Sequence, residues 1–432
     1  MTTKSLTKNH PLAGKKMMGA DMIVQILADE GVDTIFGYSG GAILPTYDAV
    51  FRFNEENKDS DGNQPMPLIV PANEQGAGFM ASGYARASGK VGVVMVTSGP
   101  GATNTVTPIR DCMADSIPIV VISGQVPTTA IGTDAFQEAP VSAIMGAVSK
   151  HIFLVTDPLL LESTIRSAFE LAKTGRPGPV VVDIPKDIQN WEGEFLGSGS
   201  LPLTGYRNRL ETVMNNNLND ELAKNFYKLL SKSKKPLIYA GGGVINADAS
   251  SQLRQFSETY KIPIVTTLMA LGASDTTKSL SLHMLGMHGL ASANYAVEDC
   301  DFLIAIGARF DDRVAGDPKG FAPNAKKIAH FDIDISEINK VKSVDWYHVG
   351  NLKKDLNDLI TLGKKIEFVS DFSGWHSHIE KLKEEYKLNY NKNSELIQPY
   401  EVIEEINKLS RGEAIISTGV GQHQMWAAQY FD

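Results

Sequence analysis

The chain has 432 residues, of which 43% are hydrophobic, with 38 glycines and 20 prolines. That length exceeds one comfortable hydrophobic core and favours two or three α/β domains, with glycine and proline in the turns between strands and helices. The formal net charge of −9 argues against a nucleic acid as the main partner, because a polyanion would be repelled.

The two cysteines, Cys112 and Cys300, are isolated in the sequence. They lack the paired spacing of a metal knuckle or a redox dithiol, so two buried thiols in a reducing compartment are the simplest interpretation. Residues 1–18 contain lysines but no apolar core of signal-peptide length, and no later stretch is apolar enough to span a bilayer. We therefore expect a cytoplasmic protein without a membrane partner.

Short apolar runs recur before glycine-rich turns along the whole chain. Helical stretches such as residues 20–30, 162–174 and 251–260 lie between them. The alternation predicts repeated βα units, and thus an α/β fold with doubly wound parallel sheets in successive domains. The predicted buried strands cover residues 34–37, 91–98, 117–123, 179–184, 236–240, 262–267, 302–307 and 328–333.

Two changes in composition divide these units. A Gly/Ser/Pro-rich stretch begins at residue 193, and a polar, lysine-rich stretch surrounds residues 381–394. They predict five segments. These are an N-terminal domain over 1–192, a linker over 193–208, a central domain over 209–370, a second linker over 371–398 and the start of a third domain over 399–432.

In the last segment, residues 414–418 are predicted to form a strand, 419–424 a loop and 425–430 the start of a helix. One strand and part of a helix cannot bury a sheet. We therefore expect the third domain to be truncated, with residues missing beyond Asp432.

One carboxylate stands at a strand end. A strand-like run at 68–70 is followed by Glu74 and by a small-residue helix that continues through Ala87. The turns after Glu74 carry too little side chain to hold it in water, so we expect a group with a hydrogen-bonding edge against it. The alternative is a carboxylate that interacts with the helix dipole, and this segment alone favours neither.

Glycine turns also follow strands in the second half of the chain. Residues 241–243 are three glycines after a predicted strand, a pattern that admits a phosphate close to backbone N–H groups but that is more often only a turn. Residues 307–309 follow another strand, and Asp332 ends a third, where it could bond a ribose or an adenine. Converging strand ends of this kind predict a dinucleotide at one sheet edge.

Eight motifs together carry a family resemblance. They are FGYSGGAILP at 36–45, NEQGAG at 73–78, TSGPGATN at 97–104, GTDAFQE at 132–138, GRPGP at 175–179, GMHG at 286–289, GARFDDR at 307–313 and GQHQMW at 421–426. With them the chain resembles the catalytic subunit of acetohydroxyacid synthase (acetolactate synthase), a thiamine-diphosphate enzyme of branched-chain amino-acid synthesis. The resemblance covers nearly everything after about residue 19, and the combination is highly specific.

The resemblance implies an enzyme that decarboxylates pyruvate on thiamine diphosphate and ligates the hydroxyethyl unit to pyruvate or 2-ketobutyrate, in valine, leucine and isoleucine biosynthesis. It implies thiamine diphosphate, Mg²⁺ and FAD as cofactors, with FAD holding the site together rather than doing net redox work. The active site would lie between the subunits of a homodimer. Whether a tetramer forms, or a small regulatory subunit binds, stays open.

Three catalytic roles are implied. Glu74 would bond the aminopyrimidine ring nitrogen and drive the shift to the imino tautomer, which makes thiamine a nucleophile. Gln137 would donate a hydrogen bond to a carbonyl oxygen that gains charge during carboligation. Arg313 would hold the carboxylate of the second keto acid. A polar loop residue and a local ion pair within residues 311–313 are the alternatives for these last two.

The remaining implied contacts fall into three groups. Gly40 and Gly41 would let the backbone approach the aminopyrimidine, although most such pairs are plain turns, and a turn before a helix explains Pro100 and Asn104 almost as well. The implied thiamine diphosphate contacts are Tyr38, Gly40, Gly41, Glu74, Pro100, Asn104, Val420, Gly421, Gln422 and His423. The implied FAD contacts are Arg176, Gly241, Gly242, Gly243, Thr267, Leu268, Gly286, Met287, His288, Gly307, Ala308, Arg309, Asp311, Arg313, Asp332, Ile333 and Asn351. Phe136 and Lys186 would line the substrate channel.

The sequence departs from the family pattern at several positions. Ser39 replaces the usual proline, Asn73 the usual histidine before the glutamate, and Asn351 the usual aspartate near the adenine. The metal-diphosphate motif, Gly-Asp-Gly followed later by Asn, is absent. We can name no metal ligand in this chain, expect the Mg²⁺ ligands beyond Asp432, and predict that the 432-residue chain alone is inactive or nearly so.

Two other functions stay open. One is a non-catalytic FAD-binding or subunit-pairing protein that kept two domains and lost the third. The other is a related thiamine carboligase or decarboxylase acting on oxalyl, glyoxylate or phenyl substrates, which shares the fold. Only Gln137 together with Arg313 argues against the second.

Overall fold

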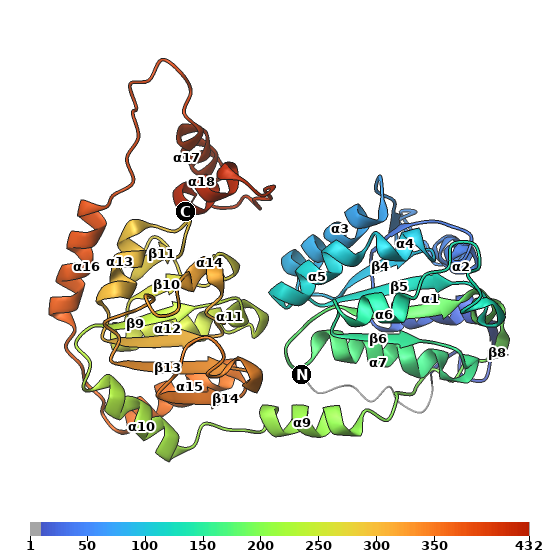
Figure 1. Ribbon diagram of the computed structural model, residues 1–432, viewed down its shortest axis with the longest axis horizontal. Helices are drawn as coiled ribbons and strands as arrows, with labels where there is room; N and C mark the ends of the chain where they lie inside the picture. The colour runs from blue at the N-terminus through green and yellow to red at the C-terminus, as the bar shows by residue number, and fades with distance from the viewer. Residues whose placement is uncertain (1–9, 432) are drawn as a thin grey trace. The chain divides into compact units, whose positions relative to one another are not determined.

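The computed structural model describes residues 10–431 and divides into two compact units, Met1–Arg207 and Asn208–Asp432 (Figure 1). Residues 1–9, part of the stretch in which we expected no signal peptide, lie outside the described residues, as does residue 432. Among the helices that are described, none is long and apolar enough to cross a membrane.

The first unit is built on a six-stranded, fully parallel sheet with the strand order β3-β2-β4-β5-β7-β6. The interior strands are continuous runs of valine and isoleucine, and every residue of β4, β5 and β7 is buried. The bounds are Ile35–Tyr38 (β2), Leu68–Ile69 (β3), Gly92–Val96 (β4), Ile119–Gln125 (β5), His151–Leu154 (β6) and Val180–Pro185 (β7). A small antiparallel pair, β1 (Lys16–Met18) with β8 (Glu192–Glu194), lies beside it.

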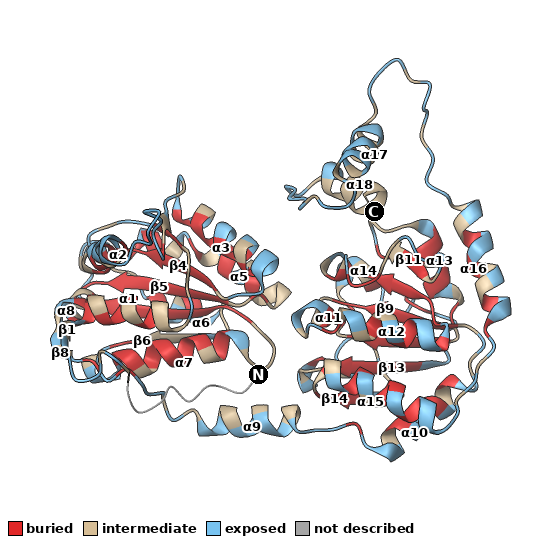
Figure 2. Cartoon of the chain, turned by 180° about the vertical axis from the view of Figure 1, so that it is seen from behind, coloured by how far each residue is buried: buried red, intermediate tan, exposed pale blue. Residues whose placement is uncertain are grey.

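Helices cover both faces of this sheet. One face packs on α1 (Gly19–Asp29) and α7 (Leu161–Lys173), whose apolar sides share a core with alternate residues of β4, β5 and β7 (Figure 2). The other helices of this unit are α2 (Leu44–Glu56), α3 (Glu74–Ser88), α4 (Pro100–Thr103), α5 (Val106–Asp115), α6 (Val141–Gly146) and α8 (Lys186–Asn190), with the 3₁₀ turns η1 (Thr128–Ala130) and η2 (Pro158–Leu160).

The small residues of α3 have a packing reason. A Cβ on Gly78 would come within 2.3 Å of Pro108 in α5, and a Cβ on Gly92 within 2.3 Å of the carbonyl of Ala81. The helix can therefore lie close to both α5 and β4. Asn73 begins the helix, because its side-chain oxygen accepts a hydrogen bond of 2.8 Å from the N–H of Gly76.

The second unit holds another parallel sheet, in the order β11-β10-β9-β12-β13-β14. In chain order this is 3-2-1-4-5-6, the order of dinucleotide-binding sheets. The bounds are Pro236–Ala240 (β9), Ile264–Thr266 (β10), Ser281–Met284 (β11), Phe302–Ile306 (β12), Lys327–Asp332 (β13) and Trp346–Val349 (β14).

The helices of the second unit pack in pairs, α12 on α15 and α13 on α16. Aromatic side chains around Phe226 fill the core between sheet and helices. The bounds are Thr204–Met214 (α9, which runs across the division), Asp220–Leu230 (α10), Gly243–Asn246 (α11), Ser250–Tyr260 (α12), Ala291–Asp299 (α13), Asp312–Ala315 (α14), Leu352–Lys365 (α15), Ser373–Glu385 (α16), Pro399–Ser410 (α17) and Gln422–Tyr430 (α18), with 3₁₀ turns η3 (Leu268–Ala270) and η4 (Ile335–Glu337).

The structure corrects three local predictions. Residues 414–418 form no strand, because no neighbouring strand among the described residues offers them a hydrogen-bonding partner, and α18 begins three residues before the predicted helix. Part of the predicted second linker is α16, whose Trp375 and Ile379 are buried in the core. At the predicted first linker, Phe195 is fully buried in the first unit.

Candidate active site

The carboxyl ends of the first sheet bring the predicted residues of that unit to one edge. The strand order reverses between β2 and β4, and ligands of open α/β sheets bind at such a point. The turn after β2 carries Tyr38, Gly40 and Gly41, the loop after β4 carries Pro100 and Asn104, and the residue that opens α3 is Glu74. Gln137 lies in the loop after β5.

Glu74 is 8% exposed and lies in the first turn of α3, where the helix dipole favours its charge. One of its oxygens, Oε2, accepts a hydrogen bond of 2.9 Å from Nδ2 of Asn104. The other lies 3.5 Å from the place that a Cβ on Gly101 would take. Burial raises the pKa of the Tyr47 hydroxyl, and the nearby charge of Glu74 raises it further. The Glu74 carboxylate therefore acts on a side chain of α2, the helix that follows β2.

Thr97, which the sequence did not single out, joins the two loops. A Cβ on Gly40 would come within 2.5 Å of Thr97, and one on Gly101 within 2.7 Å. The hydroxyl of Thr97 also accepts a hydrogen bond of 3.3 Å from the N–H of Ala42. Gly41 differs, because a Cβ there would meet nothing within 4 Å, so its missing side chain leaves open space beside the edge.

The loop at 132–138 is held by its own glutamate. Glu138 accepts hydrogen bonds from the N–H groups of Gly132 and Ala135, which lower its pKa. Gln137 has φ +58°, and its carbonyl would lie 2.3 Å from a Cβ on Gly99, so this loop packs directly on the start of α4. Phe136 is 88% exposed at the loop's tip, which leaves it available for contact with another molecule.

A second residue missed by the sequence, Gln189, supports the turn after β2. It is fully buried, and its Nε2 donates to the carbonyls of Ala42 at 2.8 Å and Ile184 at 2.9 Å. Its Oε1 accepts from the hydroxyl of Thr46 at 2.9 Å. Its place in the short helix that follows an apolar strand was the only local signal, because its partner Ala42 lies 147 residues away.

Two predicted residues of the first unit lie apart from Glu74. Lys186 opens α8, directly after β7, and is half-buried at the same carboxyl edge. Arg176 precedes β7 and therefore lies at the opposite, amino edge, where its Nε donates to Ser116 at 2.9 Å. The structure thus does not bring Arg176 to the other predicted residues of this unit.

In the second unit the strand order reverses between β9 and β12, and the glycine turns after both strands meet there. A Cβ on Gly241 would come within 2.3 Å of the carbonyl of Gly307, and one on Gly243 within 2.7 Å of the Cα of Gly307. Gly307 has φ +58°, and its carbonyl accepts a bond of 3.0 Å from the N–H of Gly243. The close approach of the two loops explains these glycines without a ligand.

Other predicted contacts at this crevice include groups that a ligand could bond. The hydroxyl of Thr267, after β10, is buried without a partner among the described residues, although a buried hydroxyl normally has one. Asp332, at the end of β13, uses one oxygen to accept from the N–H of Asp334 at 2.9 Å. Leu268 is 44% exposed beside Thr267. The amide of Asn351, in contrast, is committed to capping α15 through Lys354.

Arg313 lies in a separate part of this edge, beside the loop that carries Met287. The N–H of Met287 donates to the carbonyl of Arg313 at 2.9 Å, and a Cβ on Gly286 would lie 2.8 Å from that carbonyl. Arg313 is one of the residues that line a cavity of about 410 Å³, together with acidic residues such as Glu298 and Asp317. Among the described residues, no carboxylate lies within ion-pair distance of its guanidinium, although Asp311 accepts from its backbone N–H at 3.1 Å.

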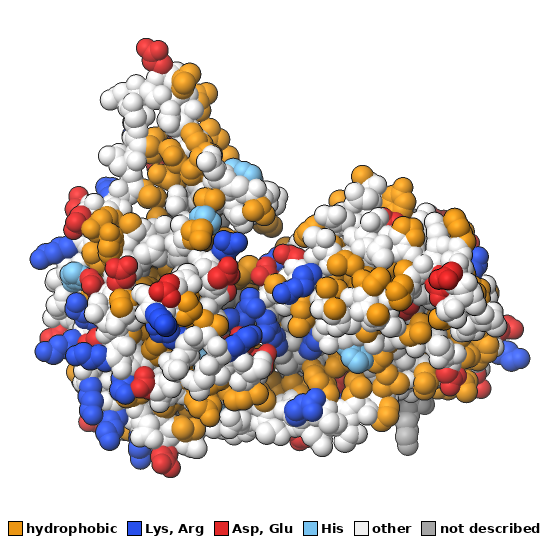
Figure 3. Space-filling view, viewed as in Figure 1, with side chains coloured by type: hydrophobic (Ala, Val, Ile, Leu, Met, Phe, Trp, Pro, Cys, Tyr) orange, Lys and Arg blue, Asp and Glu red, His pale blue; other side chains and the backbone are white. Residues whose placement is uncertain are grey.

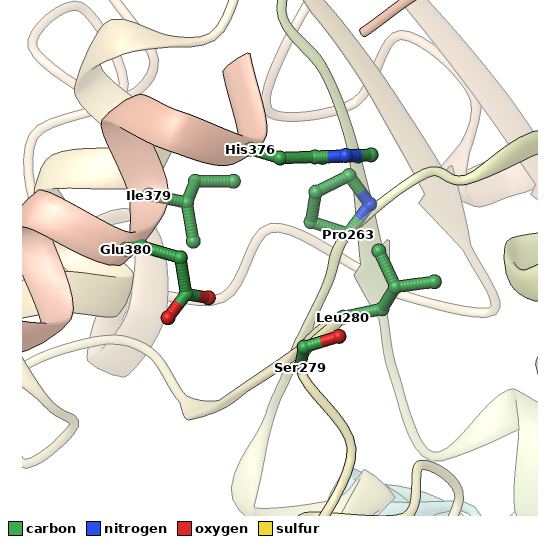
Figure 4. Close-up of a pocket in the computed structure, with 6 residues that line it drawn as sticks. All are labelled: Pro263, Ser279, Leu280, His376, Ile379 and Glu380. Carbon is green, nitrogen blue, oxygen red and sulfur yellow. The ribbon is translucent and has the colours of Figure 1, made fainter. Parts of the chain in front are cut away.

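A smaller cavity of about 190 Å³ lies before β10 and β11, at the amino edge of this sheet (Figure 4). Its histidine and glutamate side chains are already engaged. His376 Nε2 lies 2.8 Å from the carbonyl of Lys261, and Glu380 pairs with Lys383 at 3.3 Å. No predicted residue lines this cavity, and we assign it no chemistry.

The last predicted thiamine contacts lie in the turn that opens α18. Val420 is 94% exposed, Gly421 precedes the helix and Gln422 is its first residue. His423 follows and lies close to Gly419. Within residues 10–431 no group of three or more His, Cys, Asp or Glu side chains is placed to hold a metal ion.

Comparison with known families assigns both units. The family described as "Thiamine pyrophosphate enzyme, N-terminal TPP binding domain" matches residues 17–144, and "Thiamine pyrophosphate enzyme, central domain" matches residues 223–359. The acetolactate synthase large subunit of Corynebacterium glutamicum is 45% identical over 429 residues, covering 99% of this chain and 66% of that protein.

Two further relatives come from eukaryotes. The chloroplastic acetolactate synthase of Arabidopsis thaliana is 43% identical over 96% of this chain and 60% of its own length. The mitochondrial acetolactate synthase catalytic subunit of Saccharomyces cerevisiae is 42% identical over 96% of this chain and 61% of its own length. The chain thus spans 60 to 66% of the length of these relatives.

The two domain matches and the Glu74 edge define a thiamine pyrophosphate enzyme of α/β fold with parallel sheets. Within that class the chain belongs to the acetolactate synthase large-subunit family.

Proposed function

We propose that the protein is the catalytic subunit of an acetolactate synthase. It would decarboxylate pyruvate on thiamine diphosphate and ligate the hydroxyethyl unit to pyruvate or 2-ketobutyrate. The observation that carries this proposal is Glu74, a buried carboxylate bonded by Asn104 at the sheet edge of a domain that matches the thiamine-binding family. The relatives named acetolactate synthase support the choice of reaction.

The residues of the first unit fit a bound thiamine. Glu74 presents one oxygen beside Gly101, and Gly41 leaves open space where a ring can approach the backbone. When bound, thiamine diphosphate supplies the nucleophilic carbon and accepts the electrons released by decarboxylation. Glu74 would hold a proton at the pyrimidine nitrogen, and Asn104 would keep its carboxylate turned toward that atom. We assign no Mg²⁺ ligand among the described residues and route no step through the metal.

Arg313 supports a 2-keto acid as substrate. Arg313 lines a cavity that acidic residues also line, but no carboxylate of the described residues pairs with its guanidinium, so the local ion pair considered from the sequence does not form. A guanidinium binds a carboxylate through two parallel hydrogen bonds. Gln137, in the loop packed on α4, would donate to the oxygen of the carbonyl under attack.

FAD is the second proposed cofactor. The support is the 3-2-1-4-5-6 strand order, the crevice between β9 and β12, and the unpartnered hydroxyl of Thr267. The tight contact of Gly241 and Gly243 with Gly307 limits the backbone N–H groups that remain for a phosphate. Flavin released by denaturing the purified native protein should approach one per chain, and a protein without flavin would remove this cofactor from the proposal.

We also propose a homodimer in the cytoplasm. Large hydrophobic side chains are exposed around the end of β3 and the first turns of α3, namely Ile69, Val70, Phe79 and Met80, and Figure 3 shows further hydrophobic surface on the first unit. A second copy could cover them. Cys112 and Cys300 are both buried and unpaired, as expected in a reducing compartment.

The test is Glu74→Gln in the native protein, with acetolactate formed from pyruvate as the measurement. We expect most turnover to be lost, because an amide cannot exchange the proton, while the folded state remains. Glu56→Gln, at an exposed position at the end of α2, is the matched control. Full turnover in Glu74→Gln would contradict the proposal. A native protein that carries flavin but makes no acetolactate would favour the non-catalytic FAD-binding alternative.

A further inference from the structure

A carboxyl group is buried in the first sheet, on the strand next to its β6 edge, at a position that none of the proposed chemistry uses. Asp183 lies in β7, with Ser123 of β5 and Leu154 of β6 as its register partners, and it is 1% exposed. Burial raises the pKa of Asp183 to about 7, against hydrogen bonding from Gln125 and Ser123. Burying a carboxyl group that has no cationic partner costs free energy unless hydrogen bonds compensate. We therefore ask what the hydrogen bonds of Asp183 hold in place.

The principal bond of Asp183 goes to Gln125, the last residue of β5. Nε2 of Gln125 donates to Oδ2 of Asp183 at 2.9 Å, whereas Oδ1 is buried without a partner among the described residues. The same amide reaches the next segment at two points. Its oxygen accepts from the N–H of Val126 at 2.8 Å, and its Nε2 also lies 3.4 Å from the carbonyl of Ala139.

Val126 and Ala139 are the two ends of one loop. The chain leaves β5 at Val126, passes through η1 and returns at Ala139 just before α6. The side-chain amide of Gln125 therefore bonds both ends of the loop. Its orientation is fixed by the hydrogen bond to the carboxyl group of Asp183 in the neighbouring strand. The tip of this loop carries Phe136 and Gln137.

The tip has few anchors of its own. Gln137 is exposed and held at φ +58°, and Phe136 is 88% exposed. Glu138 orders residues 132–135 internally, and the carbonyl of Gln137 rests on Gly99. None of these contacts fixes where the loop leaves and rejoins the sheet. The Gln125 amide bonds both ends, whereas Asp187 of α8 adds two bonds at Thr128 near the first end only.

We propose that Asp183 is a positioning residue, which orients the Gln125 amide and, through it, the loop over 126–139 that presents Phe136 and Gln137. Asp183 touches no reacting atom in this assignment. Its effect on turnover rests on the proposed function, but its effect on the loop does not, so the two can be measured separately.

Hydrogen exchange of the native protein, followed by mass spectrometry of peptides, tests the loop. Asp183→Val removes the bond to Gln125 and places a strand-forming, apolar residue in the sheet. Gln125→Ala removes the clamp at a strand end and serves if the first variant fails to fold. We expect both to speed exchange in residues 126–139 roughly tenfold, the size expected for one lost hydrogen bond in a locally opening segment.

A double variant and a conservative variant separate positioning from general destabilisation. Asp183→Val with Gln125→Ala should exchange no faster than either alone, because both changes break one connection. Asp183→Asn keeps an acceptor for Nε2 and should leave the loop slow. Exchange in β4, residues 92–96, should stay slow in every variant. Additive effects, an unchanged loop in Gln125→Ala, or a fast loop in Asp183→Asn would overturn the proposal.

Acetolactate formation distinguishes this inference from the proposed function. If both hold, the variants with a fast loop lose turnover number, and Asp183→Asn retains it. If the loop responds as expected but the wild-type protein makes no acetolactate, the proposed function fails and the positioning role of Asp183 stands. If the wild-type protein is active and the loop does not respond, the positioning role fails alone.

Discussion

At the scale of single residues, the site depends on side-chain amides that each orient a neighbouring group by hydrogen bonds. Glu74 has one oxygen bonded by Asn104 and one beside Gly101, so Asn104 decides which oxygen is left for a ligand. Gln189 orients the turn after β2 by bonding the carbonyl of Ala42, and Gln125 orients the loop after β5 by bonding the N–H of Val126. In each case a side chain amide fixes a group that would otherwise have several orientations.

Asn104→Ala should lower turnover by roughly 10- to 100-fold, because a hydrogen bond to a charged group contributes roughly 1.5–3 kcal/mol and its loss lets the carboxylate turn. Acetolactate formation at saturating pyruvate and thiamine diphosphate measures this. Asn208→Ala, at an exposed position in α9, is the control. Turnover equal to that of the control would show that Asn104 does not hold the carboxylate.

Gln189→Met conserves volume but leaves the carbonyls of Ala42 and Ile184 and the hydroxyl of Thr46 without their partner. Each buried group left unsatisfied costs about 1–3 kcal/mol, so we expect a clear fall in the free energy of unfolding together with weaker thiamine diphosphate binding. Thr46→Val removes only one of these bonds and should affect stability alone. Calorimetric titration and chemical denaturation check both, and unchanged cofactor affinity in Gln189→Met would contradict a role in the turn.

Asp183 should make stability fall as the pH rises. Its pKa is about 7 in the folded protein, above the ordinary value near 3.9, so the unfolded chain releases this proton first. The stabilising effect of the neutral form is complete below about pH 4 and is lost progressively up to about pH 7, by an amount on the order of 4 kcal/mol. Denaturation at several pH values should show a flatter profile in Asp183→Asn, whereas Asp61→Asn, at an exposed position, should match the wild type. Identical profiles in Asp183→Asn and wild type would refute the shift.

At the scale of elements, the sequence revealed every interior strand of the two six-stranded sheets, but of their edge strands it revealed only β3, as the run at 68–70. The eight apolar runs predicted as strands are β2, β4, β5 and β7 of the first sheet and β9, β10, β12 and β13 of the second, which are all the interior strands. Strands β6, β11 and β14 were not predicted, and each lies at an edge. In β6 the end residues His151 and Leu154 are exposed. Strands β11 and β14 are mostly buried, but histidine interrupts their apolar residues, so none of the three shows a continuous apolar run.

The residues of the candidate site also fall into those that a local sequence pattern reveals and those that it does not. Glu74 and the glycine turns could be predicted, because a carboxylate or a glycine at a strand end is visible in a local pattern. The supporting residues could not, because Gln125 meets Asp183 from 58 residues away and Gln189 meets Ala42 from 147 residues away. A local pattern also predicted a strand at 414–418, and this prediction is wrong. A strand forms only where a neighbouring strand accepts and donates its backbone hydrogen bonds, and a local pattern does not show whether such a neighbour exists.

The end of α7 offers a test of how an element is terminated. Lys150 donates to the carbonyls of Leu171 at 2.5 Å, Thr174 at 2.7 Å and Arg176 at 2.8 Å, where the helix leaves carbonyls unpaired. Lys150→Met should lower the free energy of unfolding by about 1–3 kcal/mol. Lys173→Met, in the last turn of the same helix, loses only a surface pair with Glu30 and should cost less than about 1 kcal/mol. Equal losses in a chemical denaturation series would contradict the capping role.

At the scale of the whole molecule, the chain is two units with separate cores. The core of the first unit contains residues up to Phe195, and the core of the second begins at Leu218, with no residue in common. Between them runs α9, in which no residue is buried. A helix of 11 residues without a buried face is held mainly by its own hydrogen bonds, and isolated helices of that length are marginal in water.

This predicts where the native protein is cut first by an arginine-specific protease. Arg209 is exposed in α9, whereas Arg207 is held by Glu170 through two bonds of 2.8 and 2.7 Å and by the carbonyl of Leu201. Cleavage requires the backbone to open locally, which is easiest where nothing is buried. We expect early cleavage after Arg209, read by mass spectrometry of the fragments. Arg209→Gln should slow the separation of the two units markedly, because the remaining arginine of this segment is anchored to α7. Rapid cleavage after Arg207 in that variant would mean that the anchor does not hold, and that the first unit ends before α9 begins.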